Sequence, residues 1–275
     1  MKIAYTMNGL IGGLRNKNSS SSPEEDSILV LRYISNLIDK NIREHNDIDV
    51  FVFSWHTNFE KEFTKYLSPV VLKLMPQKQF KIPKHLQHGN VQRVFTHKSR
   101  WYGYKEVMKL VEDYEKENNF EYDLVVNARF DICWNKPFEF KKLDTQQFHI
   151  PYHPDRMEYG WPGTEEFCSP EILDHIFASN SKWMKHYATM FENLDVYTLP
   201  GQCQQWNTIS NHFLMVWHLG KLGLLTQDIV EKSFSNWSDK NPRIIGGSKD
   251  DYIDYDIFRY RHLDREKVLK ELEGK

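Results

Sequence analysis

The amino-acid sequence predicts an α/β fold in which helices flank a mixed β-sheet. Three short apolar runs have the length and composition of buried strands, and they span residues 2–7, 49–55 and 122–131. Segments between these runs carry apolar residues at every third or fourth position, which is typical of amphipathic helices. Strands and helices that alternate in this way predict a Rossmann-like sheet with helical crossovers on its faces.

The first predicted strand, residues 2–7, is followed by a glycine-containing turn and then by a helix. Ser22 is a candidate N-cap, Pro23 fits the first helical position, and Glu25 completes a capping box with Ser22. The apolar residues of this helix recur at helical spacing: Ile28, Leu31, Ile34, Leu37 and Ile38. One face of the helix is therefore expected to pack on the sheet.

The second strand, residues 49–55, leads into a short helix around residues 58–66 and an apolar stretch over residues 70–75. Residues 77–97 are basic and contain a proline, and their pattern predicts no element. A helix over residues 99–118 follows, with apolar and aromatic residues on one face. It leads directly into the third strand.

The second half of the sequence is less regular. Residues 148–152 predict a strand, and the Ser-Pro-Glu triplet at residues 169–171 predicts the start of another helix. Further helices are expected over the ranges 182–193, 204–219 and 264–273. No linker or repeat divides the chain, so we expect one domain over residues 1–275, with a looser half from residue 136.

The composition indicates no strong preference for polyanions. The 275 residues include 36 lysines and arginines against 38 aspartates and glutamates, so no global field favours nucleic acid or an anionic membrane. Three cysteines without a CxxC pair fit a reducing compartment. No apolar run reaches the length of a membrane span, and the N-terminus is more typical of a first strand than of a signal peptide. We therefore expect a cytoplasmic protein with no transmembrane segment and no nucleic-acid partner.

Functional residues are expected where strands end, because ligands of open α/β sheets bind at the carboxyl ends of the strands. The third strand ends in Arg129, Phe130 and Asp131. A carboxylate at this position can hold a divalent metal and, through it, a diphosphate. The alternative is an ion pair between Arg129 and Asp131 that only joins the strand end to a neighbouring helix.

The turn after the first strand is a second candidate. Gly9 and the glycines that follow it allow the backbone to approach a phosphate, and Arg15 could pair with that phosphate. The turn does not match GxGxxG and lacks a Walker lysine, so a plain turn is the alternative.

Motifs of several other enzyme classes are absent from the sequence. The twelve histidines lack the spacing of a zinc-ligand pair on one helix face. Neither GxSxG nor HExxH occurs, which disfavours hydrolases. Carboxylates of the second half are candidates for a general base toward an acceptor hydroxyl, namely Glu165, Glu166 and, on the predicted helix, Asp174.

Three segments carry a family resemblance when they are taken in order. The first is KIAYTMNGLIGGLR, a strand followed by glycines and arginine, and the second is DIDVFVFSWH, a strand that ends near tryptophan. The third is a helix beginning Ser-Arg-Trp-Tyr at residue 99 that leads into the strand ending Arg-Phe-Asp. Together they resemble nucleotide-sugar-dependent glycosyltransferases of the GT-A type, in particular members from bacterial polysaccharide gene clusters and large DNA viruses. The likeness covers mostly the first 135 residues.

This resemblance implies an enzyme of polysaccharide biosynthesis that moves a hexose or pentose from a nucleoside diphosphate sugar to a glycan or glycoconjugate. It implies a nucleotide-sugar-binding half over residues 1–135 and an acceptor-side half over residues 136–275. In such enzymes a DxD-like element holds Mn²⁺ or Mg²⁺ against the diphosphate, and Asp131 matches the metal position. The nucleotide contacts carried over by the resemblance are Asn8, Gly9, Arg15, Arg100, Tyr104 and Arg129.

The chain departs from the family pattern because Arg129 stands where the first carboxylate of the DxD element is expected. Either Asp131 holds the metal alone with the diphosphate, or Arg129 neutralises the leaving group without a metal. Two other functions stay open. One is an inactive carbohydrate- or nucleotide-binding protein, which the missing carboxylate favours. The other is a sugar nucleotidyltransferase, whose usual long glycine-rich signature the first turn fits poorly.

Overall fold

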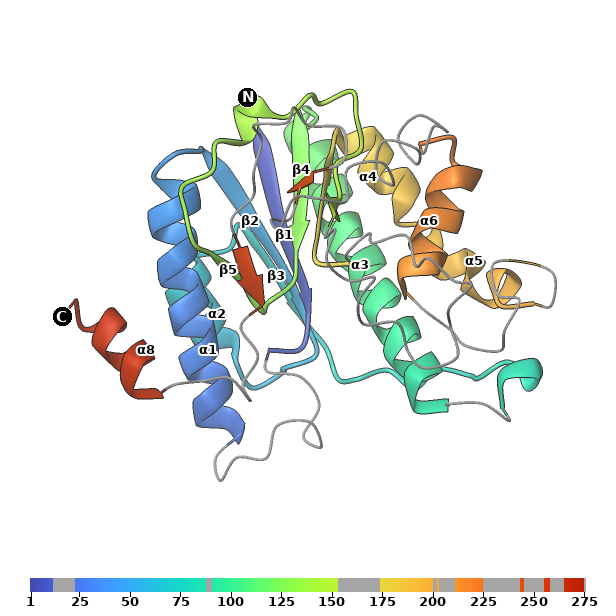
Figure 1. The fold of residues 1–275 in the computed structure, drawn as a ribbon, viewed down its shortest axis with the longest axis horizontal. Helices are drawn as coiled ribbons and strands as arrows, with labels where there is room; N and C mark the ends of the chain where they lie inside the picture. Colours follow the sequence, from blue (N-terminus) through green and yellow to red (C-terminus); the bar gives the residue numbers. More distant parts are fainter. Residues whose placement is uncertain are drawn as a thin grey trace.

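The computed structural model describes residues 1–11, 23–87, 91–152, 174–199, 202, 211–224, 243–244, 255–257 and 265–274. These residues confirm the predicted α/β class, with a mixed sheet flanked by helices (Figure 1). Every helix within the described ranges is too short or too polar to cross a membrane.

The central sheet has five strands in the order β3-β2-β1-β4-β7 among the described residues. Its strands are β1 (Ile3–Gly9), β2 (Ile48–Ser54), β3 (Val71–Leu74), β4 (Leu124–Ala128) and β7 (Ile176–Ser179). The first four run parallel, and β7 pairs antiparallel with β4. The carboxyl ends of the parallel strands therefore share one edge of the sheet with the beginning of β7.

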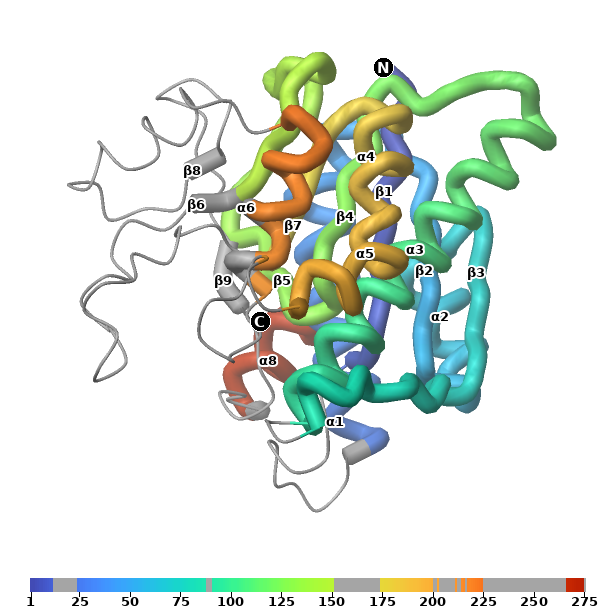
Figure 2. Tube along the Cα trace, turned by 90° about the vertical axis from the view of Figure 1, so that its right-hand side faces the viewer, coloured from blue at the N-terminus to red at the C-terminus, as the bar shows by residue number. Residues whose placement is uncertain are grey.

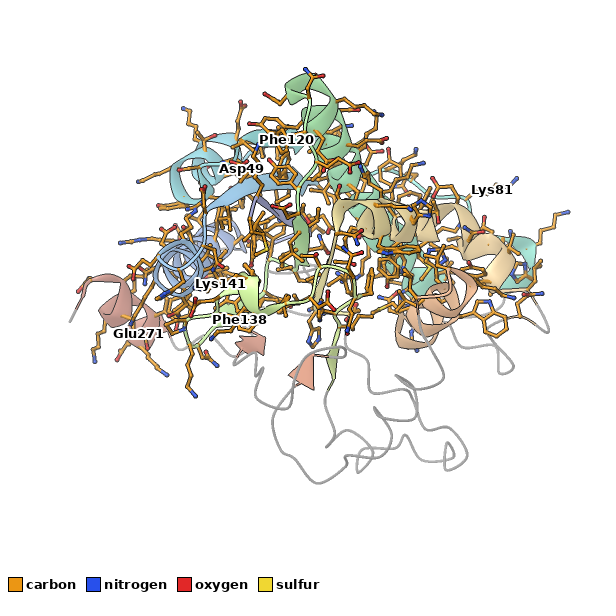
Figure 3. All side chains as sticks on the ribbon, turned by 90° about the horizontal axis from the view of Figure 1, so that it is seen from above. Asp49, Lys81, Phe120, Phe138, Lys141 and Glu271 are labelled. Atoms are coloured by element: carbon orange, nitrogen blue, oxygen red, sulfur yellow. The ribbon has the colours of Figure 1, made fainter. Side chains whose placement is uncertain are left out.

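Helices cover both faces of this sheet, and the two faces bury separate apolar clusters (Figures 1 and 2). One face packs against α1 (Pro23–Ile38), α2 (Glu60–Leu67) and β5 (Ile132–Trp134). The other packs against α3 (Val91–Asn118), α4 (Ser181–Tyr187), α5 (Met190–Tyr197) and α6 (Asn211–Lys221). Outside α1 lies α8 (Arg265–Leu272), whose Glu271 accepts a hydrogen bond from the Tyr33 hydroxyl over 2.7 Å (Figure 3).

Shorter elements complete the described structure. A π-helical turn, Asp39–Arg43, follows α1, and 3-10 turns cover Lys84–Leu86 and Phe140–Lys142. Two small antiparallel pairs join β5 with β9 (Tyr255–Ile257) and β6 (Pro151–Tyr152) with β8 (Arg243–Ile244).

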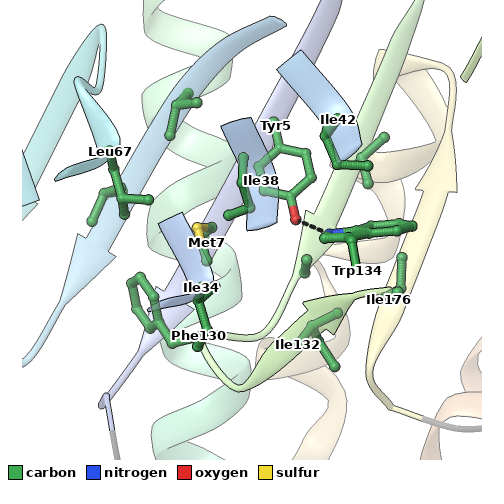
Figure 4. Close-up of a cluster of buried hydrophobic side chains, with 14 of the residues drawn as sticks. Tyr5, Met7, Ile34, Ile38, Ile42, Leu67, Phe130, Ile132, Trp134 and Ile176 are labelled. Atoms are coloured by element: carbon green, nitrogen blue, oxygen red, sulfur yellow. Dashed lines mark hydrogen bonds between the residues drawn. The ribbon is translucent and has the colours of Figure 1, made fainter. Parts of the chain in front are cut away.

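β1 divides its side chains between the two faces, because successive residues of a strand point to opposite sides. Tyr5 and Met7 enter the cluster beneath α1, where Trp134 Nε1 donates a hydrogen bond to Tyr5 Oη over 2.9 Å (Figure 4). Thr6 and Asn8 are buried on the side of α3. The same strand therefore contributes apolar residues to one layer and polar residues to the other.

The structure corrects three predicted boundaries. Residues 176–179 form β7 instead of a helix, because this apolar run has the length of a strand and pairs with β4. The helix predicted over residues 182–193 is divided into α4 and α5, and α4 begins after Asn180, whose side chain caps the N–H of Trp183. α3 begins at Val91 and so includes part of the basic segment for which no element is predicted.

Candidate functional site

The described candidate residues gather at the carboxyl edge of the sheet, which the ends of β1 and β4 and the start of β7 define. Pairing of β1 with β4 brings Asn8 and Arg129 to neighbouring strand ends. α3 passes this edge, and the Arg100 carbonyl accepts a hydrogen bond from Asn8 Nδ2 over 3.3 Å. Asp174 directly precedes His175, whose carbonyl accepts from the Arg129 backbone N–H over 3.1 Å.

Four charged side chains at this edge, Arg100, Arg129, Asp131 and Asp174, form an arginine–aspartate cluster. Arg129 donates from Nε to Asp131 Oδ1 over 2.8 Å and from Nη2 to Asp131 Oδ2. Its Nη1 lies 3.2 Å from Asp174 Oδ1. Arg100 Nε lies 3.1 Å from Asp174 Oδ2, and Arg100 Nη2 donates to the Asp174 carbonyl. One carboxylate thus holds two guanidinium groups, while the other pairs with Arg129.

The two arginines have different electrostatic surroundings. Burial acts to lower the pKa of Arg129, but Asp131 and Asp174 together raise it above its ordinary value. Burial lowers the pKa of Arg100, and Asp174 compensates only in part. The positive charge of Arg129 lowers the pKa of Arg100 further, because like charges at short distance repel. Asp174 therefore offsets the repulsion between two guanidinium groups that lie close together.

Asp131 is held in a way that does not suit a metal ligand. Both of its carboxylate oxygens accept hydrogen bonds from Arg129, so a cation would first have to replace that guanidinium. Mg²⁺ and related cations bind several oxygen ligands. Within the described ranges, no group of three His, Cys, Asp or Glu side chains could hold an ion. The described residues therefore do not fit the metal that the family resemblance implies.

A buried polar ladder, made of Thr6, Asn8 and Asn127, joins the strand ends to α3. Asn127 Nδ2 donates to Asn8 Oδ1 and to Thr6 Oγ1, each over 2.9 Å. Asn8 Nδ2 in turn donates to the carbonyl of Arg100. Gly103 allows α3 to come this close, because a Cβ at that position would lie 3.1 Å from Asn8 Nδ2. The ladder thus fixes the position of Arg100 over the carboxyl edge.

Gly9 and Tyr104 have structural roles in the described residues. Gly9 adopts a φ of 116°, in the region that favours glycine, and its carbonyl accepts a hydrogen bond from Ser54 Oγ over 2.9 Å. Tyr104 is buried between α3 and α4, where its hydroxyl donates to the Met184 carbonyl over 3.1 Å. Burial raises the pKa of this hydroxyl well above its ordinary value. The predicted nucleotide contact of Tyr104 stays a prediction, but in this structure the side chain is enclosed in the core.

Asp174 lies in a turn before β7 and not on a helix, which corrects its predicted placement. Its Oδ1 accepts from Arg129 Nη1 over 3.2 Å, and its Oδ2 accepts from Asn211 Nδ2 over 3.1 Å beside the ion pair with Arg100. A general base needs a lone pair directed at the acceptor proton, whereas these donors occupy the carboxylate of Asp174. Its geometry is that of a partner for the arginines. Three other candidates lie outside the described residues: Arg15, Glu165 and Glu166.

Two further residues of the site, Asn127 and Asn211, are not among the predicted ones. Asn127 interrupts the apolar run of β4, and a buried polar residue signals that a hydrogen-bond partner is present. Asn211 accepts a hydrogen bond from Trp101 Nε1 over 3.1 Å and donates one to Asp174, so it links Trp101 to that carboxylate. No sequence pattern marks Asn211, because its partners come from other elements of the chain.

Aromatic side chains lie at the end of β2 on the same edge. Trp55 stacks on Tyr102 with ring centroids 5.7 Å apart, and Phe80 contacts both rings. Lys78 Nζ lies 4.5 Å from the centroid of the Tyr102 ring. Because Tyr102 and Phe80 are only partly buried, this edge presents aromatic surface as well as guanidinium groups.

Comparison with protein-family models finds no family that matches the sequence, and a search of curated proteins finds no significant match. The function must therefore be inferred from the residues and their geometry.

Proposed function

We propose that the protein is a glycosyltransferase that moves a sugar from a nucleoside diphosphate sugar to a hydroxyl group of a glycan. The observation that carries this proposal is the pair of arginines, Arg100 and Arg129, at the carboxyl edge of a largely parallel sheet. Ligands of α/β proteins bind at this edge, and arginine is well suited to phosphate groups. The mixed sheet flanked by helices is compatible with the GT-A type that the sequence resembles.

The chemistry of this transfer requires positive charge at the donor diphosphate. The bond between the anomeric carbon and the diphosphate oxygen breaks, and the anomeric carbon bonds to the acceptor oxygen. The acceptor hydroxyl gives up its proton to a base, for which Glu165 and Glu166 stay the predicted candidates. Negative charge builds up on the departing diphosphate, and fixed donors in a water-poor site stabilise that charge most effectively. Arg100 and Arg129 are the described residues suited to this role.

The aromatic surface beside the arginines supports a ligand with a ring. Tyr102 and Phe80 are only partly buried, and the exposed part of each ring can contact a nucleobase or a sugar ring. We therefore place the nucleoside part of the donor toward the end of β2 and its diphosphate toward the arginine–aspartate cluster.

A donor screen tests the proposed function. Thermal unfolding is followed with UDP-, GDP- and dTDP-sugars, with and without Mn²⁺, and release of the nucleoside diphosphate is measured with glycan acceptors. We expect one donor to raise the melting temperature and to release its diphosphate faster when an acceptor is present. Nucleoside monophosphates and free sugars are the matched controls, because they lack the diphosphate. If none of the donors raises the melting temperature, the proposal is contradicted.

The arrangement of Asp131 favours a second candidate function, a carbohydrate- or nucleotide-binding protein without catalytic activity. Asp131 pairs with Arg129, and the other carboxylate of a DxD element is missing. Stabilisation by a donor without turnover on any glycan acceptor would favour this function over the transferase.

A further inference from the structure

We propose that Arg100 and Arg129 bind the donor diphosphate directly, and that Asp131 occupies this subsite as an internal anion until the diphosphate displaces it. Asp174 is the positioning residue that keeps the two arginines together. The identity of the ligand rests on the proposed transferase function. The role of Asp131 is the reverse of the metal-ligand role that the family resemblance implies.

Asp174 holds the two guanidinium groups side by side. Its Oδ1 lies 3.2 Å from Arg129 Nη1, and its Oδ2 lies 3.1 Å from Arg100 Nε. Because these contacts use opposite oxygens of one carboxylate, the arginines approach the same small volume from two elements, β4 and α3. Asn211 donates to the same carboxylate and so restricts its rotation. The pair is thus preorganised before any ligand arrives.

The arginines retain hydrogen-bond capacity beyond these contacts. A guanidinium carries five N–H donors, and Arg100 Nη1 has no acceptor within the described ranges. The side chains of Arg100 and Arg129 are 15% and 17% exposed, so neither side chain is fully enclosed. Arginine binds phosphate oxygens through two parallel hydrogen bonds. A diphosphate has enough oxygens to contact both groups at once.

The two carboxylates of the cluster differ in how firmly they are held. Asp174 is 11% exposed; its carboxylate accepts hydrogen bonds from Arg129 and Asn211 and forms an ion pair with Arg100, which also donates to its backbone carbonyl. Asp131 is 20% exposed, and its hydrogen bonds among the described residues come from Arg129 alone. Asp131 presents two oxygens to one guanidinium fork, which is also how a phosphate group would bind. It is therefore the carboxylate that an incoming diphosphate replaces.

Binding of inorganic pyrophosphate in the presence of EDTA tests this inference. Affinity is measured by calorimetry for the wild type, Asp131→Asn, Arg129→Lys and Arg43→Lys. Arg43 is the matched control, because it pairs with Asp39 at the far end of α1. We expect the wild type to bind without metal and Asp131→Asn to bind severalfold more tightly, because a competing anion is gone. Arg129→Lys should bind about tenfold more weakly, since it loses the bidentate contact, and Arg43→Lys should match the wild type.

The opposite result for Asp131 would overturn the inference. If Asp131 is a metal ligand, Asp131→Asn should lose pyrophosphate binding, and the wild type should bind pyrophosphate only when Mn²⁺ is present. Asp131→Ser removes the same carboxylate and serves if Asp131→Asn fails to fold, which circular dichroism reports. If the variants bind pyrophosphate as expected while no nucleotide sugar binds, that result would refute the transferase function and support the anion subsite. Nucleotide-sugar turnover that depends on Mn²⁺ and Asp131 would keep the transferase and refute the subsite.

Discussion

Replacing Asn8 and Asn127 with alanine, singly and together, tests whether the polar ladder holds the site. The two amides share one hydrogen bond of 2.9 Å, and both side chains are buried. Asn127→Ala leaves Asn8 Oδ1 without its donor, which should lower the free energy of unfolding by about 1–3 kcal/mol. Asn8→Ala removes the same bond and the contact with the Arg100 carbonyl, whereas Asn127→Ala also removes the bond to Thr6 Oγ1, so the two losses should be of similar size. The double variant should lose about 1 kcal/mol less than the sum, because the shared bond is removed only once.

Urea denaturation followed by tryptophan fluorescence measures these free energies, and donor affinity is measured on the same variants. If the two losses add to within about 0.5 kcal/mol, the ladder does not couple the residues. A comparison with affinity then separates structure from recognition. If Asn8 only supports the structure, Asn8→Ala and Asn127→Ala should weaken donor binding to a similar extent, because both variants disturb the position of Arg100. A loss of affinity confined to Asn8→Ala would mean that Asn8 contacts the ligand itself.

Three other predictions concern stability. Burial lowers the pKa of His218 from 6.5 to about 4, so between these values the unfolded chain binds a proton that the folded chain does not. The free energy of unfolding should therefore fall by roughly 3 kcal/mol as the pH drops from 6.5 to 4. His218→Gln should flatten this pH dependence. If the variant keeps the pH profile of the wild type, His218 is not its source. Gly103→Ala gains about 1 kcal/mol of helix propensity but meets Asn8 Nδ2 at 3.1 Å, an overpacking cost of about 1–3 kcal/mol. We expect urea denaturation to show net destabilisation, and a more stable variant would contradict the close approach of α3 to β1. Tyr5→Phe leaves the buried Trp134 Nε1 without its acceptor and should cost about 1–3 kcal/mol in the same assay; no loss would show that Trp134 has another acceptor.

The order of elements in the first half could be predicted from the sequence, because each has a local signal. β1, β2 and β4 lie within or near their predicted ranges, since buried parallel strands appear as continuous apolar runs. β7 could not be predicted in this way. Its apolar run is short, and the Ser-Pro-Glu triplet upstream favours a helix start, so only pairing with β4 identifies it as a strand. The antiparallel direction of β7 is likewise a tertiary property.

The candidate site shows the same division. Arg129 and Asp131 were predictable, because they directly follow an apolar run that ends at a sheet edge. Their contact with each other agrees with the ion-pair alternative drawn from the sequence. The link from Asp174 to Arg100 was not predictable, because it joins α3 to the start of β7, which are distant in the chain. The burial of Tyr104 was not predictable either, because helical periodicity does not distinguish a core tyrosine from one at a ligand site.

The contact between Arg129 and Asp174 also joins the end of β4 to the start of β7. The chain leaves β4 at Arg129 and enters β7 after Asp174 and His175, and the ion pair fastens these two points together with the hydrogen bond from Arg129 N to His175 O. Because this ion pair and this hydrogen bond use no residue between 153 and 173, we expect substitutions of Glu165 and Glu166 to leave them in place.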